Sequence, residues 1–182
     1  MYYLKEMIGE DKVNLALRSL IEKFAYKSAP YPTSADLMDA LKEQTPEEYQ
    51  YLYGDLFEEI TLFANRTIEA TYEERPDGKY DVKLVVECKK LRADEEGNEN
   101  EIEINDWIEI GAFAKAPDDE KFGATLHRER VHITEADNEF TFTVDEMPDS
   151  VGIDPFKLLI DRMPKDNMKK PKQVEKEDLV AG

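Results

Sequence analysis

The side chains best suited to chemistry in this sequence are two histidines and one cysteine, and their spacing does not assemble a site. His127 and His132 are five residues apart in a run with strand-like alternation, so their side chains should leave opposite faces of the strand. Ligands of one metal ion must converge, and this pair cannot. Cys88 is the only cysteine, which excludes an internal disulfide and leaves the redox compartment open. It falls on an apolar strand face, whereas a thiol nucleophile needs an electropositive, partly exposed setting, so we expect an inert thiol.

Two polar motifs match functional patterns only in part. Asp94-Glu95-Glu96-Gly97 has the acidity of a calcium loop but lacks the alternating ligand spacing of an EF-hand. Asn65-Arg66-Thr67 matches the N-glycosylation acceptor pattern, which would matter only in a secreted eukaryotic protein. We interpret both motifs as incidental.

A group of tyrosines could form a stacking surface for sugars or bases. Their helical spacing instead favours packing in the core and between helices. The group consists of Tyr2, Tyr3, Tyr26, Tyr31, Tyr49, Tyr51 and Tyr53. We therefore assign no catalytic, cofactor-binding or metal-binding residue to this chain.

Composition excludes several classes of protein. The 182 residues are 41% apolar and 36% charged, which is typical of a soluble globular chain. No run approaches the roughly 20 apolar residues of a membrane-spanning helix. With 24 Lys and Arg against 42 Asp and Glu, the formal net charge is −18, so phosphate backbones are repelled and nucleic acid is not an expected partner. The N-terminus lacks the stages of a signal peptide and starts inside an amphipathic helix, which favours a chain cut from a longer one.

Residues 1–62 have helical periodicity. Gly9 should separate an opening helix from a second one, and Thr33 should begin a third with Asp36 as its capping partner. The motif Thr45-Pro46-Glu47-Glu48 predicts the start of a fourth helix. The apolar stripes predicted for the core are Val13, Leu17, Leu20, Ile21 and Phe24 in the second helix, and Tyr49, Leu52, Leu56, Phe57 and Ile60 in the fourth.

The period changes to two near residue 61. Ile68, Ala70 and Tyr72 alternate with polar residues, as in a strand with one wet face. Pro76-Asp77-Gly78 predicts a hairpin turn, because Pro fixes one backbone angle and Gly tolerates positive φ. One face of the following strand should carry Tyr80, Val82, Leu84, Val86 and Cys88.

Further strand-like runs follow at short intervals. They are residues 102–113 after an acidic turn at 95–100, then residues 126–133, 140–144 and 151–160. Residues 163–182 are polar without a period, so we expect a loop or frayed tail. The predicted fold is α+β, with a helical segment at 1–62, an antiparallel immunoglobulin-like β-sandwich at 63–162 and a polar tail at 163–182.

Three segments carry a resemblance to a known family. They read YYLKEMIGEDKVNLALRSLI at 2–21, YKSAPYPTSADLMDAL at 26–41, and VGIDPFKLLIDR at 151–162 with Asp166-Asn167. The first two resemble the helical end of the catalytic domain of zinc aminopeptidases of the aminopeptidase N family. The third resembles the closing strand of the β-sandwich that follows it. The nearest likeness is to bacterial members in which the peptidase follows an ABC-transporter-type permease.

The resemblance implies a non-catalytic C-terminal part of a metallo-aminopeptidase. In that family zinc is held by His-Glu-x-x-His and a distant Glu, and no such motif occurs between Met1 and Gly182. Tyr2 and Tyr3 lack the Lys-Gly that usually follows the family's catalytic tyrosine, so neither inherits its role. The chain alone is then no enzyme and carries no cofactor, while zinc is expected in a parent protein attached to the bacterial inner membrane.

The resemblance also sets the expected partners. They are the zinc-bearing domain of the parent and, through it, peptide substrates. If that domain normally covers the helices, an apolar helical face should lie exposed or close a homodimer, and the residues concerned include Met7, Leu17, Ile21, Phe24, Leu52 and Leu56. The alternative is a free-standing β-sandwich module that binds peptide or carbohydrate.

Overall fold

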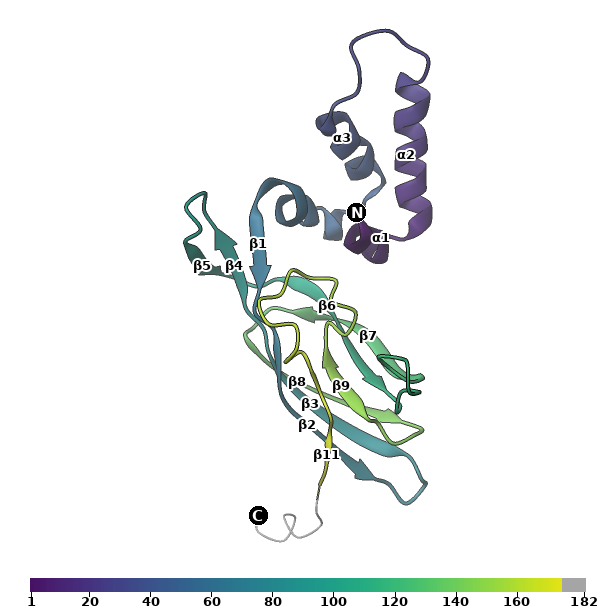
Figure 1. Cartoon of the computed structure of the whole chain (residues 1–182), viewed down its shortest axis with the longest axis vertical. Helices are drawn as coiled ribbons and strands as arrows, with labels where there is room; N and C mark the ends of the chain where they lie inside the picture. The colour runs from purple at the N-terminus through teal and green to yellow at the C-terminus, as the bar shows by residue number, and fades with distance from the viewer. Residues whose placement is uncertain (175–182) are drawn as a thin grey trace. The chain divides into compact units, whose positions relative to one another are not determined.

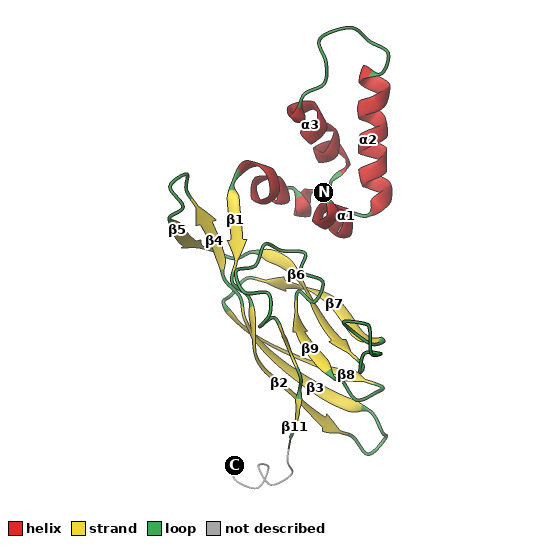
Figure 2. Cartoon of the chain, viewed as in Figure 1, coloured by secondary structure: helices red, strands yellow, loops and turns green. Residues whose placement is uncertain are grey.

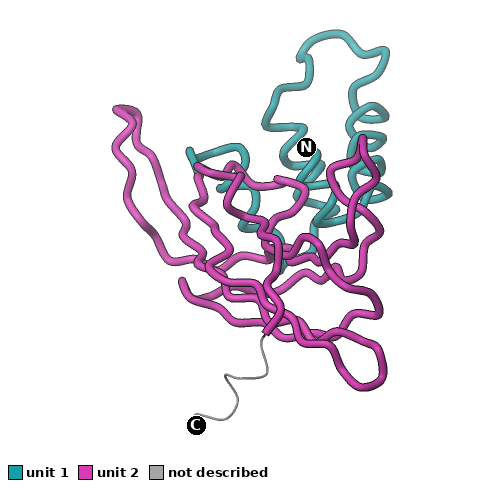
Figure 3. Tube along the Cα trace, turned by 60° about the horizontal axis from the view of Figure 1, so that its bottom comes forward, with its two compact units in different colours: residues 1–61 teal, residues 62–182 magenta. Residues whose placement is uncertain are grey.

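The chain divides into two compact units, Met1–Thr61 and Leu62–Gly182 (Figure 3). The computed structural model describes residues 1–174, so the part of the expected tail from 175 to 182 lies outside the described residues. No helix among the described residues combines the length and the apolar character needed to cross a membrane.

The first unit is helical, with α1 (Tyr2–Ile8), α2 (Glu10–Phe24) and α3 (Ser34–Gln44) (Figure 1). Gly9 separates α1 from α2 as predicted, at φ 93°, a value that favours glycine. The predicted capping box of α3 is also confirmed. The Thr33 hydroxyl accepts from the Asp36 amide at 3.4 Å, and the Asp36 carboxylate accepts from the Thr33 amide at 2.9 Å.

The region predicted as a fourth helix after Thr45 is helical but irregular. It contains the 3₁₀ helix η1 (Glu47–Tyr49), a turn, and a helical stretch at 52–58 that ends in the π-helix η2 (Gly54–Glu58). The Thr45 hydroxyl donates to the Leu41 carbonyl at 2.9 Å and lies 2.6 Å from the Tyr53 hydroxyl, so it does not cap a new helix. The predicted cap at Thr45 is therefore wrong, because its hydroxyl is engaged by Leu41 and Tyr53.

Only some side chains of the apolar stripes predicted for the helical unit are buried in the core. Met7 and Leu52 are buried, Leu17 and Leu56 are half-buried, and Ile21 is 63% exposed. Those that the prediction placed in the core and the structure exposes are Ile21, Phe57 and Ile60. Part of the predicted helical stripe thus lacks a cover within its own unit.

The strands of the described chain lie in the second unit apart from residues 60–61, and the chain is α+β as predicted (Figure 2). One four-stranded sheet has the order β11 (Lys172–Gln173), β2 (Arg66–Glu74), β3 (Tyr80–Glu87), β8 (Asp137–Val144). The other has the order β10 (Met168–Lys169), β9 (Ser150–Ile153), β6 (Asp106–Phe113), β7 (Thr125–Ile133). A smaller sheet has the order β1 (Ile60–Phe63), β4 (Lys90–Ala93), β5 (Glu99–Ile102). The two larger sheets are compatible with the expected sandwich.

The hairpin predicted at Pro76-Asp77-Gly78 is confirmed. It joins β2 to β3 in antiparallel register, and Gly78 has φ 83°. The predicted inner face of β3 is confirmed as well, since its apolar side chains Val82, Leu84 and Val86 are buried together with Cys88 beyond the strand end.

The alternation predicted for β2 fails at its N-terminal end, at Thr67 and Ile68. The register with β3 shifts between Thr67 and Glu69, which leaves Ile68 as the extra residue of a β-bulge. Ile68 is exposed, whereas Thr67 is buried in its place. A bulge inserts one residue into a period-two pattern, so every side chain before it changes face.

The C-terminal predictions need two corrections. The run at 151–160 is a strand only to Ile153, because Asp154 has φ 42° and Pro155 has no amide to donate. Residues 163–174 are not a free tail, since β10 pairs antiparallel with β9 and β11 pairs parallel with β2. This segment therefore adds one strand to each of the larger sheets.

Candidate functional site

The two histidines lie against different neighbours. The His127 ring stacks on Phe142 of β8 with ring centroids 4.0 Å apart. The His132 ring stacks on Trp107 of β6 at 4.8 Å, and its Nε2 lies 2.6 Å from Asn105 Oδ1. Over residues 1–174, no three His, Cys, Asp or Glu side chains are grouped so as to hold a metal ion.

Cys88 matches the expectation of a buried thiol. Burial raises its pKa to about 12, and the negative charges of Asp161, Glu87 and Asp137 act in the same direction. A thiol with that pKa holds almost no thiolate at neutral pH. Cys88 is therefore a core residue of the second unit.

The acidic loop at residues 94–97 closes on itself. Asp94 accepts hydrogen bonds from the amides of Glu96 at 3.1 Å and Asn98 at 2.8 Å, and from the Asn98 side chain at 2.9 Å. These bonds, with the Asn98 side chain foremost, lower the pKa of Asp94. Gly97 completes the turn at φ 85°. The loop is the tip of the β4–β5 hairpin.

The prediction that the tyrosines pack in the core is right for Tyr53 and wrong for others. Tyr53 is buried and pairs with Thr45. Tyr2, Tyr26 and Tyr31 are exposed. They lie in α1 and in the segment between α2 and α3.

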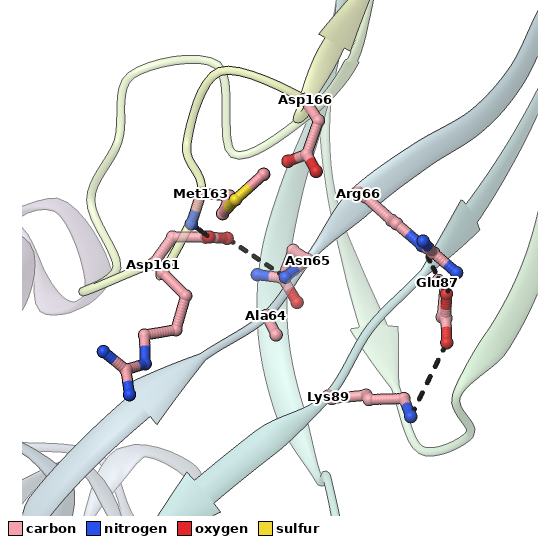
Figure 4. Close-up of a pocket in the computed structure, with 9 residues that line it drawn as sticks. Ala64, Asn65, Arg66, Glu87, Lys89, Asp161, Met163 and Asp166 are labelled. Carbon is pink, nitrogen blue, oxygen red and sulfur yellow. Dashed lines mark hydrogen bonds and ion pairs between the residues drawn. The ribbon is translucent and has the colours of Figure 1, made fainter.

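A cleft of about 310 Å³ lies within the second unit (Figure 4). It forms where residues 160–166 run beside residues 62–67: the Phe63 amide donates to the Ile160 carbonyl, and the Arg162 amide donates to the Phe63 carbonyl, both at 2.9 Å. Its lining consists of Ala64, Asn65, Arg66, Glu87, Lys89, Asp161, Arg162, Met163 and Asp166.

Asp161 holds one wall of this cleft. One carboxylate oxygen accepts from the Asn65 amide at 3.1 Å and the other from the Met163 amide at 2.7 Å. Asp154, earlier in the same segment, accepts from the amides of Leu158 at 2.8 Å and Leu159 at 3.2 Å. Asp154 and Asp161 therefore both use their carboxylates to accept hydrogen bonds from backbone amides.

Two of the residues that line the cleft, Asn65 and Asp166, have buried side-chain atoms without a hydrogen-bond partner. Asn65 is 1% exposed, and neither its side-chain nitrogen nor its oxygen has a hydrogen-bond partner in the protein. Asp166 Oδ1 is also buried without a partner, although the Asp166 main chain is fixed by a bond from the Thr67 amide to its carbonyl at 3.0 Å. A buried polar atom without a partner costs about 1–3 kcal/mol, so these groups lower the stability of the fold unless something inside the protein satisfies them.

The charged groups at the rim are paired with one another. Arg66 forms an ion pair with Glu87, and Arg162 forms one with Glu99. Lys89 Nζ lies 3.7 Å from Glu87 Oε1 and 3.4 Å from Glu101 Oε2. The cations of the rim are therefore neutralised within the protein.

The sequence did not predict this cleft. It singled out Asn65 only as a glycosylation acceptor, and a side chain that is buried in the folded chain is not accessible to that modification. Searches against protein-family models and curated proteins found no match to the chain.

Proposed function

We propose that this chain is the non-catalytic C-terminal part of a zinc metallo-aminopeptidase of the aminopeptidase N family, in the bacterial type joined to an ABC-transporter-like permease. In this proposal the helical unit buttresses the zinc-bearing domain. The strand unit, taken as an immunoglobulin-like sandwich, acts as its spacer. The zinc domain removes N-terminal residues from peptides, and this chain supplies no group to that reaction.

An uncovered apolar groove on the helical unit supports the proposal best. It has a volume of about 250 Å³ and is lined by Leu20, Ile21, Phe24, Ala25 and Pro32. Covering apolar surface stabilises a protein by roughly 25 cal/mol per Å², so an exposed face of this kind favours a partner. The groove lies at the C-terminal end of α2, and two of the segments that carry the family resemblance contribute to it, with Leu20 and Ile21 from 2–21 and Pro32 from 26–41.

The second candidate is a module that binds peptide or carbohydrate. The observation that favours it is the cleft of about 310 Å³ in the second unit. This candidate needs no zinc domain. The two candidates are therefore separable by one experiment on the complete gene product.

The experiment is to express the complete reading frame that contains Met1–Gly182 and to measure bound zinc and hydrolysis of aminoacyl-p-nitroanilides. We expect a His-Glu-x-x-His motif before Met1, one zinc per molecule, and activity that is lost when the motif's Glu becomes Gln. A reading frame without that motif, or a product that binds no zinc, contradicts the aminopeptidase proposal and leaves the binding module.

A further inference from the structure

We propose that a basic and aromatic patch on the outer face of the β6–β7 pair docks an acidic segment of a protein partner. The patch consists of Lys121, Arg128, Phe156 and Lys157, which come from the β6–β7 loop, from β7 and from the turn after β9. All four residues are exposed. The patch lies in the second unit and shares no residue with the cleft or with the groove of α2, so the inference goes beyond the proposed function and does not depend on it.

The patch lies on the side of the sheet that faces away from the core. In β6, the side chains of Ile108, Ile110 and Ala112 are buried in the core. Because side chains alternate along a strand, Glu109 points to the opposite face. There its carboxylate lies 2.8 Å from Nε of Arg128 in β7. Arg128 therefore belongs to the outer face of the β6–β7 pair.

The fold holds the Phe156 ring at the surface of this face. The turn that carries it has a positive φ at Asp154, 42°, and at Lys157, 55°, and such values cost energy in residues other than glycine. The ring packs edge to face with Phe122 at a centroid distance of 6.2 Å, and the Arg128 guanidinium lies 4.8 Å from its centroid. Phe156 is nevertheless 41% exposed. The turn therefore presents a large apolar ring in a fixed orientation.

Lys121 and Lys157 bring two positive charges together beside this ring. Lys121 Nζ donates to the carbonyl of Pro155, two residues before Lys157, at 2.8 Å and lies 4.4 Å from the Phe122 centroid. Neither lysine forms an ion pair with any residue of 1–174. Partial desolvation, followed by the charge of Lys157, lowers the pKa of Lys121, against the negative charge of Asp154. A carboxylate bound between the two ammonium groups would offset their repulsion, so the pair favours an anion.

The basic surface continues from the patch along β7. In the antiparallel register Arg130 lies opposite Glu109 and His132 lies opposite Trp107, so both basic side chains share the outer face with Arg128. At a rise of about 3.3 Å per residue, the row from residue 128 to residue 132 is about 13 Å long. That length corresponds to four or five residues of an extended peptide.

This size favours a short acidic segment over a larger polyanion. The whole chain has a formal net charge of −18, and charges are screened beyond about 8 Å at physiological salt. A short segment can therefore lie within the basic surface, with an apolar residue against Phe156. A nucleic-acid duplex or an anionic membrane would extend over the acidic surface around it. The acidic residues 118–120 precede Lys121 in the same loop, but they are not among the charges that shift its pKa.

The test is an NMR titration of the ¹⁵N-labelled chain with the peptide acetyl-Glu-Glu-Leu-Glu-Glu-amide and with its analogue in which Gln replaces every Glu. We expect the acidic peptide to shift the amides of residues 121–132 and 155–158 in a saturable way. It should bind about tenfold more tightly than the Gln analogue, because several exposed ion pairs together have that effect. Equal binding of the two peptides, or no saturable shift with the acidic one, would overturn the proposal.

Oligothymidylate and phosphatidylserine vesicles are titrated in parallel. We expect both to bind more weakly than the acidic peptide at the same amides. Tighter binding of either would assign the patch to nucleic acid or to a membrane and would contradict a protein partner.

Variants of the two lysines locate the binding groups. Lys121→Gln and Lys157→Gln should each weaken binding of the acidic peptide about threefold, and the double variant about tenfold. The exposed controls Lys27→Gln and Lys165→Gln should bind as the wild type does. Folding is checked by the dispersion of the same spectra, and if Lys121→Gln does not fold, Lys157→Gln decides the question. Wild-type affinity in a folded Lys157→Gln variant contradicts the proposal.

Discussion

Lys90 Nζ lies 3.0 Å from both carboxylate oxygens of Asp106, and both side chains are buried. Lys90 begins β4 of the three-stranded sheet, and Asp106 begins β6 of a four-stranded sheet. The pair therefore links two sheets of the second unit. The Phe63 ring lies beside it, with its centroid 5.7 Å from Nζ.

Breaking this ion pair from one side should destabilise the second unit strongly. Lys90→Met or Asp106→Leu leaves one buried charge without its opposite and should lower the free energy of unfolding by about 3–5 kcal/mol. The double variant removes both charges and should cost clearly less than the sum of the single variants. Chemical denaturation followed by circular dichroism measures all three. Additive losses would mean that the two side chains do not interact.

Gly152 should not tolerate a side chain. A Cβ atom at Gly152 would lie 1.9 Å from the Asn167 carbonyl oxygen and 2.8 Å from Thr67 Oγ1. That carbonyl accepts from the Ile153 amide at 3.0 Å and from the Thr67 hydroxyl at 2.6 Å, so it cannot move without losing both bonds. We expect Gly152→Ala to lower the free energy of unfolding by about 1–3 kcal/mol. Gly54→Ala, at a site with open space and without a positive φ, is the steric control. A Gly152→Ala variant as stable as the wild type would disprove the close packing of β9 on residue 167.

Asp154 should make the stability of the second unit depend on pH. Burial raises its pKa from 3.8 to about 6, against the opposing hydrogen bonds from the amides of Leu158 and Leu159. The negative charges of Asp161 and Glu109 raise it further. Because the folded state holds the proton more tightly than the unfolded state, this residue stabilises the fold fully below about pH 4.

That contribution is lost as the pH rises from about 4 to about 6, and it should amount to about 2–3 kcal/mol at most. Comparison with Asp154→Asn isolates it, since the amide does not titrate. The difference in unfolding free energy between wild type and variant should shift in favour of the variant over this interval and stay constant above pH 7. A difference that is flat from pH 4 to 7 would contradict a raised pKa.

Residues 163–174 should be required for a stable second unit. They contain β10 and β11, and Asn167 accepts the two hydrogen bonds that fix it to β2 and β9. A chain ending at residue 162 should show a markedly lower melting temperature than one ending at residue 174. Equal melting temperatures would show that this segment contributes no stability.

The sequence predicted the elements whose signals are local. The inner face of β3 follows from alternation, and the α3 start follows from Thr33 and Asp36, which are three residues apart. Ile68 was placed on the wrong face because a bulge leaves no mark in a period-two pattern. The first two features depend on residues close together in the sequence, whereas the position of the bulge depends on the pairing of β2 with β3.

The cleft depends on contacts between distant residues. The Asn65 amide reaches Asp161 across 96 positions, and Thr67 reaches Asn167 across 100. Neither the composition nor the periodicity of a sequence indicates which residues so far apart in the chain form hydrogen bonds with each other.

The most direct test of the proposed role is whether the apolar groove of α2 is covered in the complete gene product. Ile21 is 63% exposed, and the native Cys88 is buried with its pKa raised to about 12, so maleimide labelling of Ile21→Cys reports the groove without interference from Cys88. Labelling rates are read peptide by peptide by mass spectrometry in the isolated chain and in the complete product. Thr141→Cys, at an exposed position of β8, serves as the control. We expect rapid labelling at position 21 in the isolated chain and at least tenfold slower labelling in the complete product, with unchanged rates at position 141. Equal rates at position 21 in both proteins would contradict the role of this chain as a support for a larger catalytic domain.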